Sequence, residues 1–484
     1  MSLNGLHVLI LGLGESGLAM ARWCARQGAR LRVADTRATP PGLAQLQATL
    51  PAAEFVSGAF DKALLSGIDL LAISPGLSAG QMVVFEACAR GIRVAGEIEL
   101  FAEALRDLGV RERCKVIAIT GTNGKTTTTA LTAHLCAAAG RDVALGGNIS
   151  PAALDALMAR LDAGQLPEIW VLELSSFQLE TLETLHPDAA AVLNVSDDHL
   201  DRYIDLEEYA SAKARILTGC GVQVLNRQDA RVRRMALADR RLFSFGLDAP
   251  GDVEDFGLRQ RKDGAGGLWL VQGEQFLLPM AQLPIPGLHN AANALAALAL
   301  CHALGLPLSR LVSGLQTFKG LPHRVEFVAE FEGVRYYDDS KGTNVGASIA
   351  GLGGLGGQMV AASAAGAAPR VVLIAGGDGK GQDFLPLAQT VAEYARAVVL
   401  IGRDAALIAT ALQDCGVPLR QAGSMMQAVA LAAAEARPGD AVLLSPACAS
   451  FDMYRNYVHR AQEFIAAVAA LMLTRRQQRG NDAA

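Results

Sequence analysis

The segment from Ile117 to Thr127 constrains the fold of this chain more than any other stretch, and it reads I-A-I-T-G-T-N-G-K-T-T. Four residues suited to a buried strand lead into a glycine-containing turn, a lysine, and hydroxyl residues that open a predicted helix. Backbone N–H groups of such a turn can hold phosphate oxygens, Lys125 can neutralise them, and Thr126 can offer its hydroxyl to Mg²⁺. The segment therefore predicts a strand, loop and helix that bind ATP.

The predicted phosphate loop departs from the common pattern in one place. Ile119 stands where that pattern has a glycine, five residues before Gly124. The alternative is an ordinary strand, turn and helix in which Gly-Lys occurs by accident. A glycine, a Gly-Lys pair and hydroxyl residues coincide here between a strand and a helix, which favours the phosphate interpretation. The residues predicted to hold the triphosphate are Gly121, Thr122, Asn123, Gly124, Lys125, Thr126 and Thr127.

Length and composition narrow the class of protein. The chain of 484 residues is long enough for about three domains with separate cores. A net charge of −5 without a basic run gives no general attraction to nucleic acid or anionic lipid. The eight cysteines are scattered without a Cys-x-x-Cys pair, which predicts reduced packing residues. Neither an export signal nor an apolar run of membrane-crossing length is evident, so we expect a cytoplasmic protein.

The amino-terminal stretch predicts a β-α-β unit. Strand-like residues 7–11 precede a turn in which Gly12, Gly14 and Gly17 follow the Gly-x-Gly-x-x-Gly pattern, and a second strand ends at Asp35. This spacing is typical of dinucleotide sites, so the motif taken alone favours NAD. A Rossmann-like fold does not fix the ligand, however, and no hydride-transfer constellation is evident in the rest of the chain.

We predict an α/β protein of three domains, with boundaries at 1–113, 114–320 and 321–484. The first and third domains are expected to be Rossmann-like. The central domain is expected to resemble a P-loop ATPase with a mostly parallel sheet, because strand-like runs alternate with helical ones. Residues 246–284 alternate apolar and polar positions between Gly and Pro, which suggests β-hairpins appended to that core.

Two stretches are predicted to lack regular structure. Residues 351–369 are rich in Gly and Ala and carry no charge, which suggests a loop insertion, to which we assign no function. The basic and polar tail from Thr474 is expected to fray.

Two polar side chains follow apolar strands of the central domain. Glu173 ends the strand that starts at Ile169, a position from which an acid reaches Mg²⁺ beside a phosphate loop. His199 follows another strand, at the sheet edge where open α/β sheets bind ligands. A histidine considered alone is more often a satisfied structural residue, but the acids around His199 favour a ligand role.

Three motifs of the third domain also follow strands. They are Y-Y-D-D-S-K-G-T-N at 336–344, G-G-D-G-K at 376–380 and S-P-A-C-A-S-F-D at 445–452. The first two pair acids with a lysine, which suits anion and ribose contacts. Each motif alone could be a solvated turn. Together they predict a substrate pocket at one edge of a sheet, facing the ATP site.

These motifs resemble those of a known family, the Mur ligases, over nearly the whole chain. The sequence Asp339-Ser340-Lys341 followed by Thr-Asn, and G-L-P-H-R at 320–324, are similar to the members of the family that add D-glutamate. The segments that carry the resemblance are 120–126, 173–179, 198–202, 287–290, 320–324, 339–341 and 445–450.

The resemblance implies a reaction in which ATP phosphorylates a substrate carboxylate. The amine of D-glutamate then attacks the acyl phosphate through a tetrahedral intermediate. A carboxylate is a poor acyl donor because its leaving group is oxide, whereas phosphate leaves readily, and cations must offset the crowded negative charge. The implied substrates are UDP-N-acetylmuramoyl-L-alanine and D-glutamate. Neither a nucleic acid nor a membrane is expected as a partner. A monomer is our hypothesis, and the sequence leaves the oligomeric state open.

The resemblance also assigns metal ligands. Lys125 and Thr126 would hold phosphate and the first Mg²⁺ together with Glu173, and His199 would serve a second Mg²⁺. Lys213 matches the position of a carbamylated lysine in the family, and a carbamate would turn its cation into a carboxylate-like group that can bind or orient metal. Without the resemblance, Lys213 would be interpreted as a surface lysine on a helix.

The remaining implied contacts fall into three groups. The adenosine or phosphates of ATP would meet Asn290, Asn293, Arg324 and Asp339. D-Glutamate would lie among Lys341, Thr343, Lys380, Ser450, Phe451 and Tyr457. The UDP-linked substrate would contact Gly14, Ser16, Asp35, Thr36, Arg37, Ser74 and Asn148.

Three interpretations follow from the sequence. The first is a D-glutamate ligase, with UDP in the amino-terminal domain ranked above NAD. The second keeps the chemistry and changes the amino acid, as in another Mur-type or a folylpolyglutamate-like ligase, and the motif at 339–341 is the feature against it. The third is a non-catalytic nucleotide sensor, against which Glu173, His199 and Lys213 argue.

Overall fold

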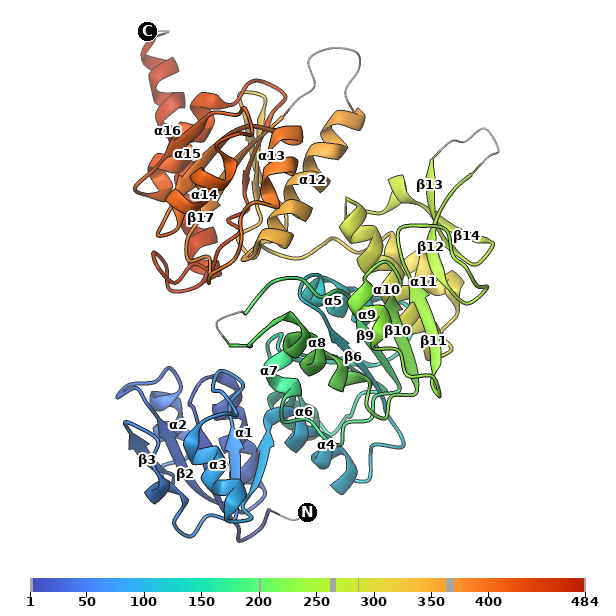
Figure 1. Ribbon diagram of the computed structural model, residues 1–484, viewed down its shortest axis with the longest axis vertical. Helices are drawn as coiled ribbons and strands as arrows, with labels where there is room; N and C mark the ends of the chain where they lie inside the picture. Colours follow the sequence, from blue (N-terminus) through green and yellow to red (C-terminus); the bar gives the residue numbers. More distant parts are fainter. Residues whose placement is uncertain (1–2, 200–201, 262–266, 286, 363–369, 483–484) are drawn as a thin grey trace. The chain divides into compact units, whose positions relative to one another are not determined.

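The computed structural model describes residues 3–199, 202–261, 267–285, 287–362 and 370–482 (Figure 1). Within these residues the strands form three sheets of five, nine and six strands, each covered by helices. The predicted α/β class with mostly parallel sheets is confirmed. The chain divides into two compact units. Unit 1 comprises Met1–Val195, Glu207–Leu278 and Asn293–Gln316, and unit 2 comprises Ser196–Leu206, Pro279–Ala292 and Thr317–Ala484.

The first sheet, in unit 1, is parallel throughout. Its strand order is β3 (Glu54–Ser57), β2 (Arg30–Asp35), β1 (His7–Leu11), β4 (Leu70–Ile73) and β5 (Arg93–Gly96). The chain order reverses between β1 and β4, and in such sheets the crevice at that point binds ligands. The glycine-rich turn lies there, between β1 and the first helix. The helices of this part are α1 (Glu15–Arg26), α2 (Leu43–Thr49), α3 (Met82–Ala89) and α4 (Glu97–Asp107), with a 3₁₀ turn at Lys62–Leu65.

The second sheet, also in unit 1, has the order β14, β13, β12, β11, β10, β9, β6, β8, β7. Strands β6, β8 and β9 are almost entirely buried, as expected for parallel strands with helices on both faces. The prediction of appended β-hairpins is confirmed for β12 and β13, which pair antiparallel. The bounds are β6 (Lys115–Thr120), β7 (Val143–Gly147), β8 (Ile169–Glu173), β9 (Ala189–Val192), β10 (Val222–Asn226), β11 (Arg241–Phe245), β12 (Phe256–Gln260), β13 (Leu268–Gln272) and β14 (Gln275–Pro279).

The helices around the second sheet include α10, which contains the division between the two units. Their bounds are α5 (Lys125–Ala138), α6 (Ala153–Asp162), α7 (Ser176–Leu179), α8 (Leu206–Ala214), α9 (Ala230–Arg234), α10 (Leu288–Ala303) and α11 (Leu308–Leu315), with 3₁₀ turns at Arg215–Leu217 and Met280–Gln282.

The third sheet, in unit 2, has the order β15 (Glu326–Phe331), β16 (Val334–Asp338), β20 (Ala441–Leu444), β17 (Val371–Gly376), β18 (Ala395–Ile401) and β19 (Leu419–Gln421). Only the β15–β16 pair is antiparallel among its described pairings. One face packs on α12 (Val345–Ala362), α13 (Leu387–Tyr394) and α14 (Ala405–Leu412), and the other on α15 (Met425–Glu435) and α16 (Tyr457–Asp482). Successive residues of β17 therefore enter different cores, as strand alternation requires.

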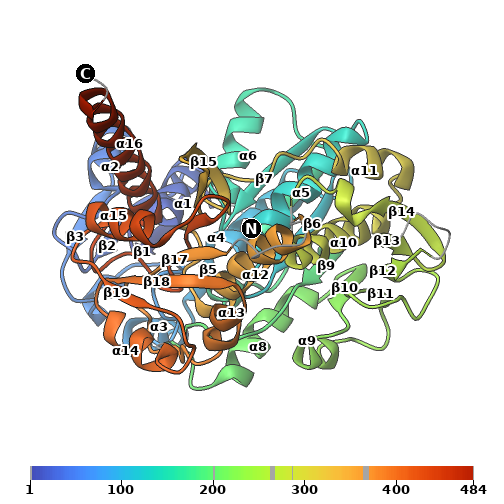
Figure 2. The same ribbon diagram turned by 90° about the horizontal axis from the view of Figure 1, so that it is seen from above.

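Both predictions of irregular structure are wrong where the structure describes the residues. Residues 351–362 belong to α12, while residues 363–369 lie outside the described part. The helix forms because Leu352, Leu355 and Met359 recur at helical spacing and are buried against the sheet, so packing offsets the poor propensity of the glycines. The tail also stays helical, since α16 continues to Asp482 (Figures 1 and 2).

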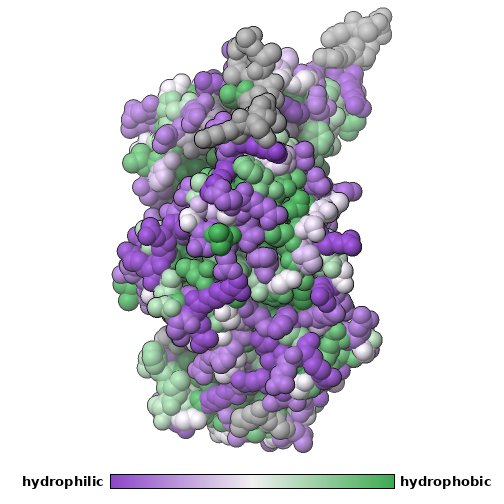
Figure 3. Space-filling model, turned by 90° about the vertical axis from the view of Figure 1, so that its right-hand side faces the viewer, coloured by the Kyte–Doolittle hydropathy of each residue, from purple (hydrophilic) through white to green (hydrophobic). Residues whose placement is uncertain are grey.

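On the face drawn in Figure 3 polar residues cover much of the surface, and apolar residues gather in patches between them. Among the described residues, no helix has the length and apolar character needed to cross a membrane.

Candidate functional site

The predicted phosphate loop of unit 1 connects buried strand β6 to α5. Gly124 caps α5 in the left-handed region, with a φ of 83°, and a Cβ there would lie 2.4 Å from Asn293 Oδ1. A Cβ on Gly121 would lie 2.9 Å from the Cβ of Leu193. Both positions therefore require glycine, and the loop packs closely on its neighbours while the N-terminus of a fourteen-residue helix follows it.

Asn194, which the sequence did not single out, holds this loop from the end of β9. Its side-chain Oδ1 accepts from Asn123 N at 2.8 Å, its Nδ2 donates to Asn123 O at 3.0 Å, and its carbonyl accepts from Thr122 N at 2.9 Å. The available signal was its place directly after an apolar strand. Asn194 therefore fixes the backbone of the predicted cradle.

Two lysines converge on one carbonyl of the loop. Lys125 Nζ donates to Gly121 O at 2.8 Å and to Thr122 O at 2.9 Å, and Lys213 Nζ donates to Gly121 O at 2.9 Å. Lys213 is only 1% exposed, and its Nζ lies 4.3 Å from the ring centroid of Tyr209. The interpretation of Lys213 as a surface lysine is therefore wrong.

Glu173 ends β8 with one carboxylate oxygen unused. Oε1 accepts from Asn148 Nδ2 at 2.8 Å, whereas Oε2 is buried and has no hydrogen-bond partner among the described residues. The register pairs Glu173 with Ile119 of β6, one strand from the phosphate loop, and Thr126 is buried at the start of α5. The carboxylate oxygen of Glu173 that has no described partner and the hydroxyl of Thr126 in the first turn of α5 are both oxygen donors, the type of ligand that Mg²⁺ takes.

In the amino-terminal motif, Asp35 is fully engaged within the protein. Its Oδ2 accepts from Leu13 N and Arg37 Nη2, both at 2.8 Å, and its Oδ1 accepts from Arg37 N and Nε. The hydrogen bonds from Arg37 hold the pKa of Asp35 down to about 2. Because a dinucleotide site uses this acid to bind ribose hydroxyls, the arrangement argues against NAD.

The other residues predicted to bind the UDP-linked substrate lie at the ends of strands or at the start of α1. Gly14 caps α1, Ser16 lies in its first turn, and the side chain of Ser74 donates to Gly12 O at 2.9 Å. Thr36 and Arg37 are exposed directly after β2, and Asn148 is exposed after β7.

Ser74 also lines a small pocket with Glu97 and Gln178. Glu97 is a second acid that sequence reasoning missed. Its Oε1 accepts from Leu154 N at 2.7 Å, while Oε2 has no partner among the described residues. Burial raises the pKa of Glu97 to about 7.

In unit 2, the three motifs of the third domain meet at one sheet edge, as predicted. The register places Asp338 of β16 beside Leu444 of β20, and Leu444 beside Ile374 of β17. Ser445 Oγ donates to Asp339 Oδ2 at 2.6 Å, and Asp378 and Ala449 exchange backbone hydrogen bonds.

The residues of unit 2 that were predicted to bind D-glutamate or the nucleotide differ in how deeply they are buried. Ser450 is 2% exposed, Phe451 is 74% exposed, and Lys341 Nζ lies 5.2 Å from the ring centroid of Tyr457. Thr343 and Asn290 are half-buried. The Nε of Arg324 is buried without a hydrogen-bond partner among the described residues. Asn293 belongs to unit 1, where its Oδ1 accepts from Thr128 Oγ1 at 3.2 Å.

Asp198, named in the sequence only as part of a motif, is the centre of a polar cluster in unit 2. Lys380 Nζ lies 2.9 Å from Asp198 Oδ1, and Asn344 Nδ2 donates to Oδ2 at 3.3 Å. His199 Nε2 is 3.6 Å from Asp198 Oδ2, and His199 adopts a positive φ of 57°. Leu200 and Asp201 of the same motif lie outside the described residues.

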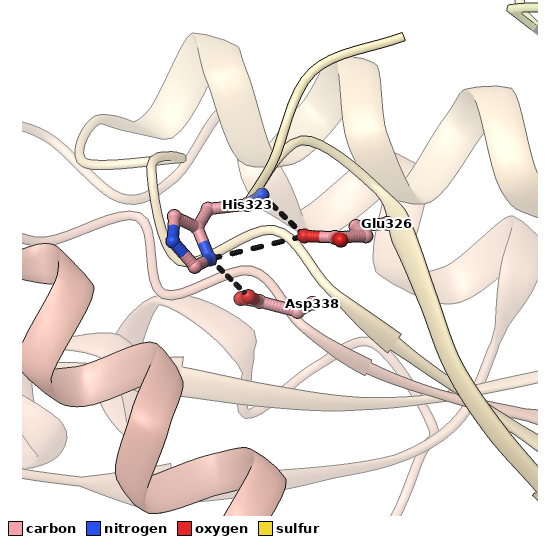
Figure 4. Close-up of side chains that lie close together, drawn as sticks. All are labelled: His323, Glu326 and Asp338. Carbon is pink, nitrogen blue, oxygen red and sulfur yellow. Dashed lines mark hydrogen bonds and ion pairs between the residues drawn. The ribbon is translucent and has the colours of Figure 1, made fainter. Parts of the chain in front are cut away.

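A further histidine, His323, lies between two acids at the start of the third domain (Figure 4). Its Nδ1 lies 2.6 Å from Asp338 Oδ2, and its backbone N donates to Glu326 Oε2 at 2.8 Å. The antiparallel register of β15 and β16 places Glu326 opposite Asp338. Hydrogen bonding explains this cluster, and we assign no metal to it.

Three family models match consecutive parts of the chain. The Mur ligase MurD-like N-terminal domain matches residues 6–96, the Mur ligase middle domain 119–301, and the Mur ligase glutamate ligase domain 323–448. The chain belongs to the Mur ligase family.

Its curated relatives are similar over their full length. The UDP-N-acetylmuramoylalanine--D-glutamate ligase of Aromatoleum aromaticum is 60% identical over 473 residues, covering 97% of this chain and 98% of the relative. The enzyme of the same name from Nitrosospira multiformis is 54% identical, covering 98% of each.

Solved structures show the same fold. The UDP-N-acetylmuramate-alanine ligase of Thermotoga maritima matches with a TM-score of 0.60 at 19% identity, over 96% of this chain and 99% of that one. MurF of Acinetobacter baumannii matches with a TM-score of 0.55 at 20% identity, over 79% and 82%.

We expect nucleotide binding to depend on the protonation of Asp339. Burial raises the pKa of Asp339 to about 7, and the hydrogen bond from Ser445 opposes that rise. The sequence predicts that Asp339 contacts the adenosine or phosphates of ATP. Protonation lowers its capacity to accept hydrogen bonds there, so ATP affinity should fall as the pH drops through the pKa. Ser445→Ala should raise the pKa further and move the fall to higher pH.

Calorimetric titration of ATP between about pH 5.5 and about pH 8.5 tests this dependence. Proton binding by ATP itself affects all variants equally. A difference between the pH profiles of a variant and of wild type therefore comes from the protein. Ser424→Ala, which removes a helix-capping hydroxyl at α15, is the control and should retain the wild-type profile. Superimposable profiles for Ser445→Ala and wild type would contradict the assignment.

Proposed function

We propose that this chain is an ATP-dependent ligase that joins D-glutamate to UDP-N-acetylmuramoyl-L-alanine, a step of peptidoglycan precursor synthesis. The observation that carries the proposal is the 60% identity, over 97% of the chain, to a relative named for this ligase. The phosphate cradle and the orphaned Glu173 oxygen support the use of ATP with Mg²⁺.

The proposed reaction has two steps. A carboxylate oxygen of the UDP-linked substrate attacks the γ-phosphorus of ATP, and ADP leaves. The amine of D-glutamate then attacks the acyl carbon, loses a proton, and expels phosphate to leave an amide. Each step crowds negative charge, so donors and cations fixed in place before the reaction lower the barrier.

We propose that residues of unit 1 hold the triphosphate. N–H groups of the loop and of the start of α5, within residues 121–127, would donate to phosphate oxygens, and Lys125 would exchange its carbonyl partners for phosphate. Thr126 and Glu173 would hold Mg²⁺, which supplies positive charge to the phosphates when bound. The nucleotide contacts assigned from the sequence to Asn290, Asn293, Arg324 and Asp339 remain our proposal, as does a second metal ion at His199.

Lys213 is proposed to carry a carbamate. Lys213 is buried, and its Nζ donates to Gly121 O of the phosphate loop. An unmodified ammonium at that place would repel Mg²⁺. Addition of CO₂ would replace that cation with an anion that orients metal.

The proposed substrate residues keep the assignments made from the sequence. The UDP-linked substrate would meet Gly14, Ser16, Asp35, Thr36, Arg37, Ser74 and Asn148, with Asp35 acting through the turn that it holds. D-Glutamate would meet Lys341, Thr343, Lys380, Ser450, Phe451 and Tyr457. Since Lys380 pairs with Asp198, binding of D-glutamate there requires competition with that acid.

The domain boundaries 1–113, 114–320 and 321–484 remain our proposal, as do a cytoplasmic location and a monomeric state. The first boundary falls between α4 and β6, and the second follows α11.

Phosphate release tests the proposed substrate. With ATP and UDP-N-acetylmuramoyl-L-alanine present, we expect release with D-glutamate and background release with L-glutamate, D-alanine, L-lysine or diaminopimelate. Release with another amino acid would keep the ligase chemistry and refute the acceptor. Absence of release with every amino acid would favour the nucleotide-sensor interpretation.

Lys213→Ala tests the carbamate. We expect this variant to lose about 99% of the activity or more, because metal positioning is lost, and short carboxylic acids added to the assay should restore part of it. Lys115→Ala, which removes an exposed lysine paired with Asp188, is the control and should keep wild-type activity. Full activity of Lys213→Ala would rule out the carbamate.

A further inference from the structure

Arg460, in unit 2, has one of the largest fully buried side chains among the described residues, and no other described arginine is buried to this degree. It lies one turn into α16, which begins at Tyr457, and it is 1% exposed. In the part of the chain that the structure describes, its guanidinium bonds to neutral oxygen atoms alone. Burial lowers its pKa to about 10, so the group is still a cation at neutral pH.

Burying a cation without a partner acid costs free energy, so the contacts of Arg460 need a reason. A guanidinium presents its donors in a rigid, planar fork. Such a fork fixes the positions of the oxygen atoms that accept hydrogen bonds from it. A lysine ammonium fixes its acceptors less firmly, because its donors rotate on a flexible stem.

The oxygen atoms held by Arg460 come from two loops that contain proposed acceptor-site residues. Nε donates to Ser340 Oγ at 3.0 Å and Nη2 donates to Ser340 O at 2.8 Å. Nη1 donates to Cys448 O at 3.0 Å. Ser340 Oγ in turn donates to Tyr457 O at 2.8 Å. The guanidinium therefore joins the loop after β16, the loop after β20 and the start of α16.

The end of β17 packs against the same group. A Cβ on Gly377 would lie 2.3 Å from Ala449 O and 3.4 Å from Arg460 Nη1. Gly377 has a φ of 134°, which favours glycine. The backbone around Arg460 thus leaves little room for the loops to shift independently.

We propose that Arg460 is a positioning residue for the acceptor amino acid. It holds Lys341 and Thr343, on the first loop, in register with Ser450 on the second and with Tyr457 at the helix start. The inference rests on the proposed function, because those residues are assigned to D-glutamate there. Arg460 acts through these loops and touches no substrate.

Arg460→Lys is the first test, because it keeps the charge and removes the fork. We expect the KM for D-glutamate to rise about tenfold or more, with kcat within about threefold of wild type, since misplacement of a binding loop weakens ground-state contacts. The KM for UDP-N-acetylmuramoyl-L-alanine should stay unchanged, because its proposed residues belong to unit 1.

Arg396→Lys is the matched control. Arg396 is a largely buried arginine of the same sheet, but it lies at the opposite end of the strands and pairs with the buried acid Asp440. This variant should lower thermal stability and leave the KM for D-glutamate at the wild-type value. An equal rise of that KM in both variants, or no rise in Arg460→Lys, would overturn the proposal.

Ser340→Ala decides the question if Arg460→Lys does not fold. It removes the hydroxyl between Arg460 and Tyr457 and leaves the guanidinium in place. We expect a rise in the KM for D-glutamate in the same direction, and a wild-type value would refute the proposal.

Hydrogen–deuterium exchange separates this inference from the proposed function. Arg460→Lys should speed exchange in both 339–344 and 447–451, and Arg396→Lys should not. If wild type showed no D-glutamate-dependent phosphate release, the proposed function would fail, and exchange would still test the positioning role. Unchanged exchange in both loops would refute it.

Discussion

Cationic side chains that donate to loop carbonyl oxygens fix the backbone of the candidate binding loops within each unit. In unit 1, Lys125 and Lys213 converge on Gly121 O, and in unit 2 Arg460 holds Ser340 O and Cys448 O. These loops leave the carboxyl ends of parallel strands, where backbone groups no longer have ladder partners. Cations satisfy those carbonyls inside the protein and so fix the course of each loop.

The buried acids of the candidate site differ in how many hydrogen-bond donors surround them. Asp35 accepts four hydrogen bonds, three of them from Arg37, so its pKa is about 2 and its role is to hold the glycine-rich turn. Asp339 is buried with a pKa of about 7, and Glu173 keeps an oxygen without a partner among the described residues. Such acids carry a desolvation cost that a bound cation or hydroxyl donor would relieve. The same residue type thus has a structural role at Asp35, and at Asp339 and Glu173 it has the burial that suits the proposed binding roles.

The sequence predicted what depends on local pattern. The strand, glycine turn and lysine at 117–127, the acid that ends β8 and the convergence of three strand-end motifs all followed from spacing and strand alternation. Asn194 follows an apolar strand, but its hydrogen bonds to a loop 71 residues away do not follow from local pattern. Arg460 belongs to no recognisable motif, and its bonds to Ser340 span 120 residues. The helix at 345–362 was missed because glycine and alanine obscured the apolar spacing of Leu352, Leu355 and Met359.

The transfer of carboxylate oxygen to phosphate tests the central claim most directly. UDP-N-acetylmuramoyl-L-alanine labelled with ¹⁸O in its carboxylate would be incubated with ATP and D-glutamate, and the released phosphate examined by mass spectrometry. Activation as an acyl phosphate predicts one labelled oxygen in each phosphate formed from fully labelled substrate. Phosphate that carries no label would contradict the account, because ATP would then have been cleaved without activating that carboxylate.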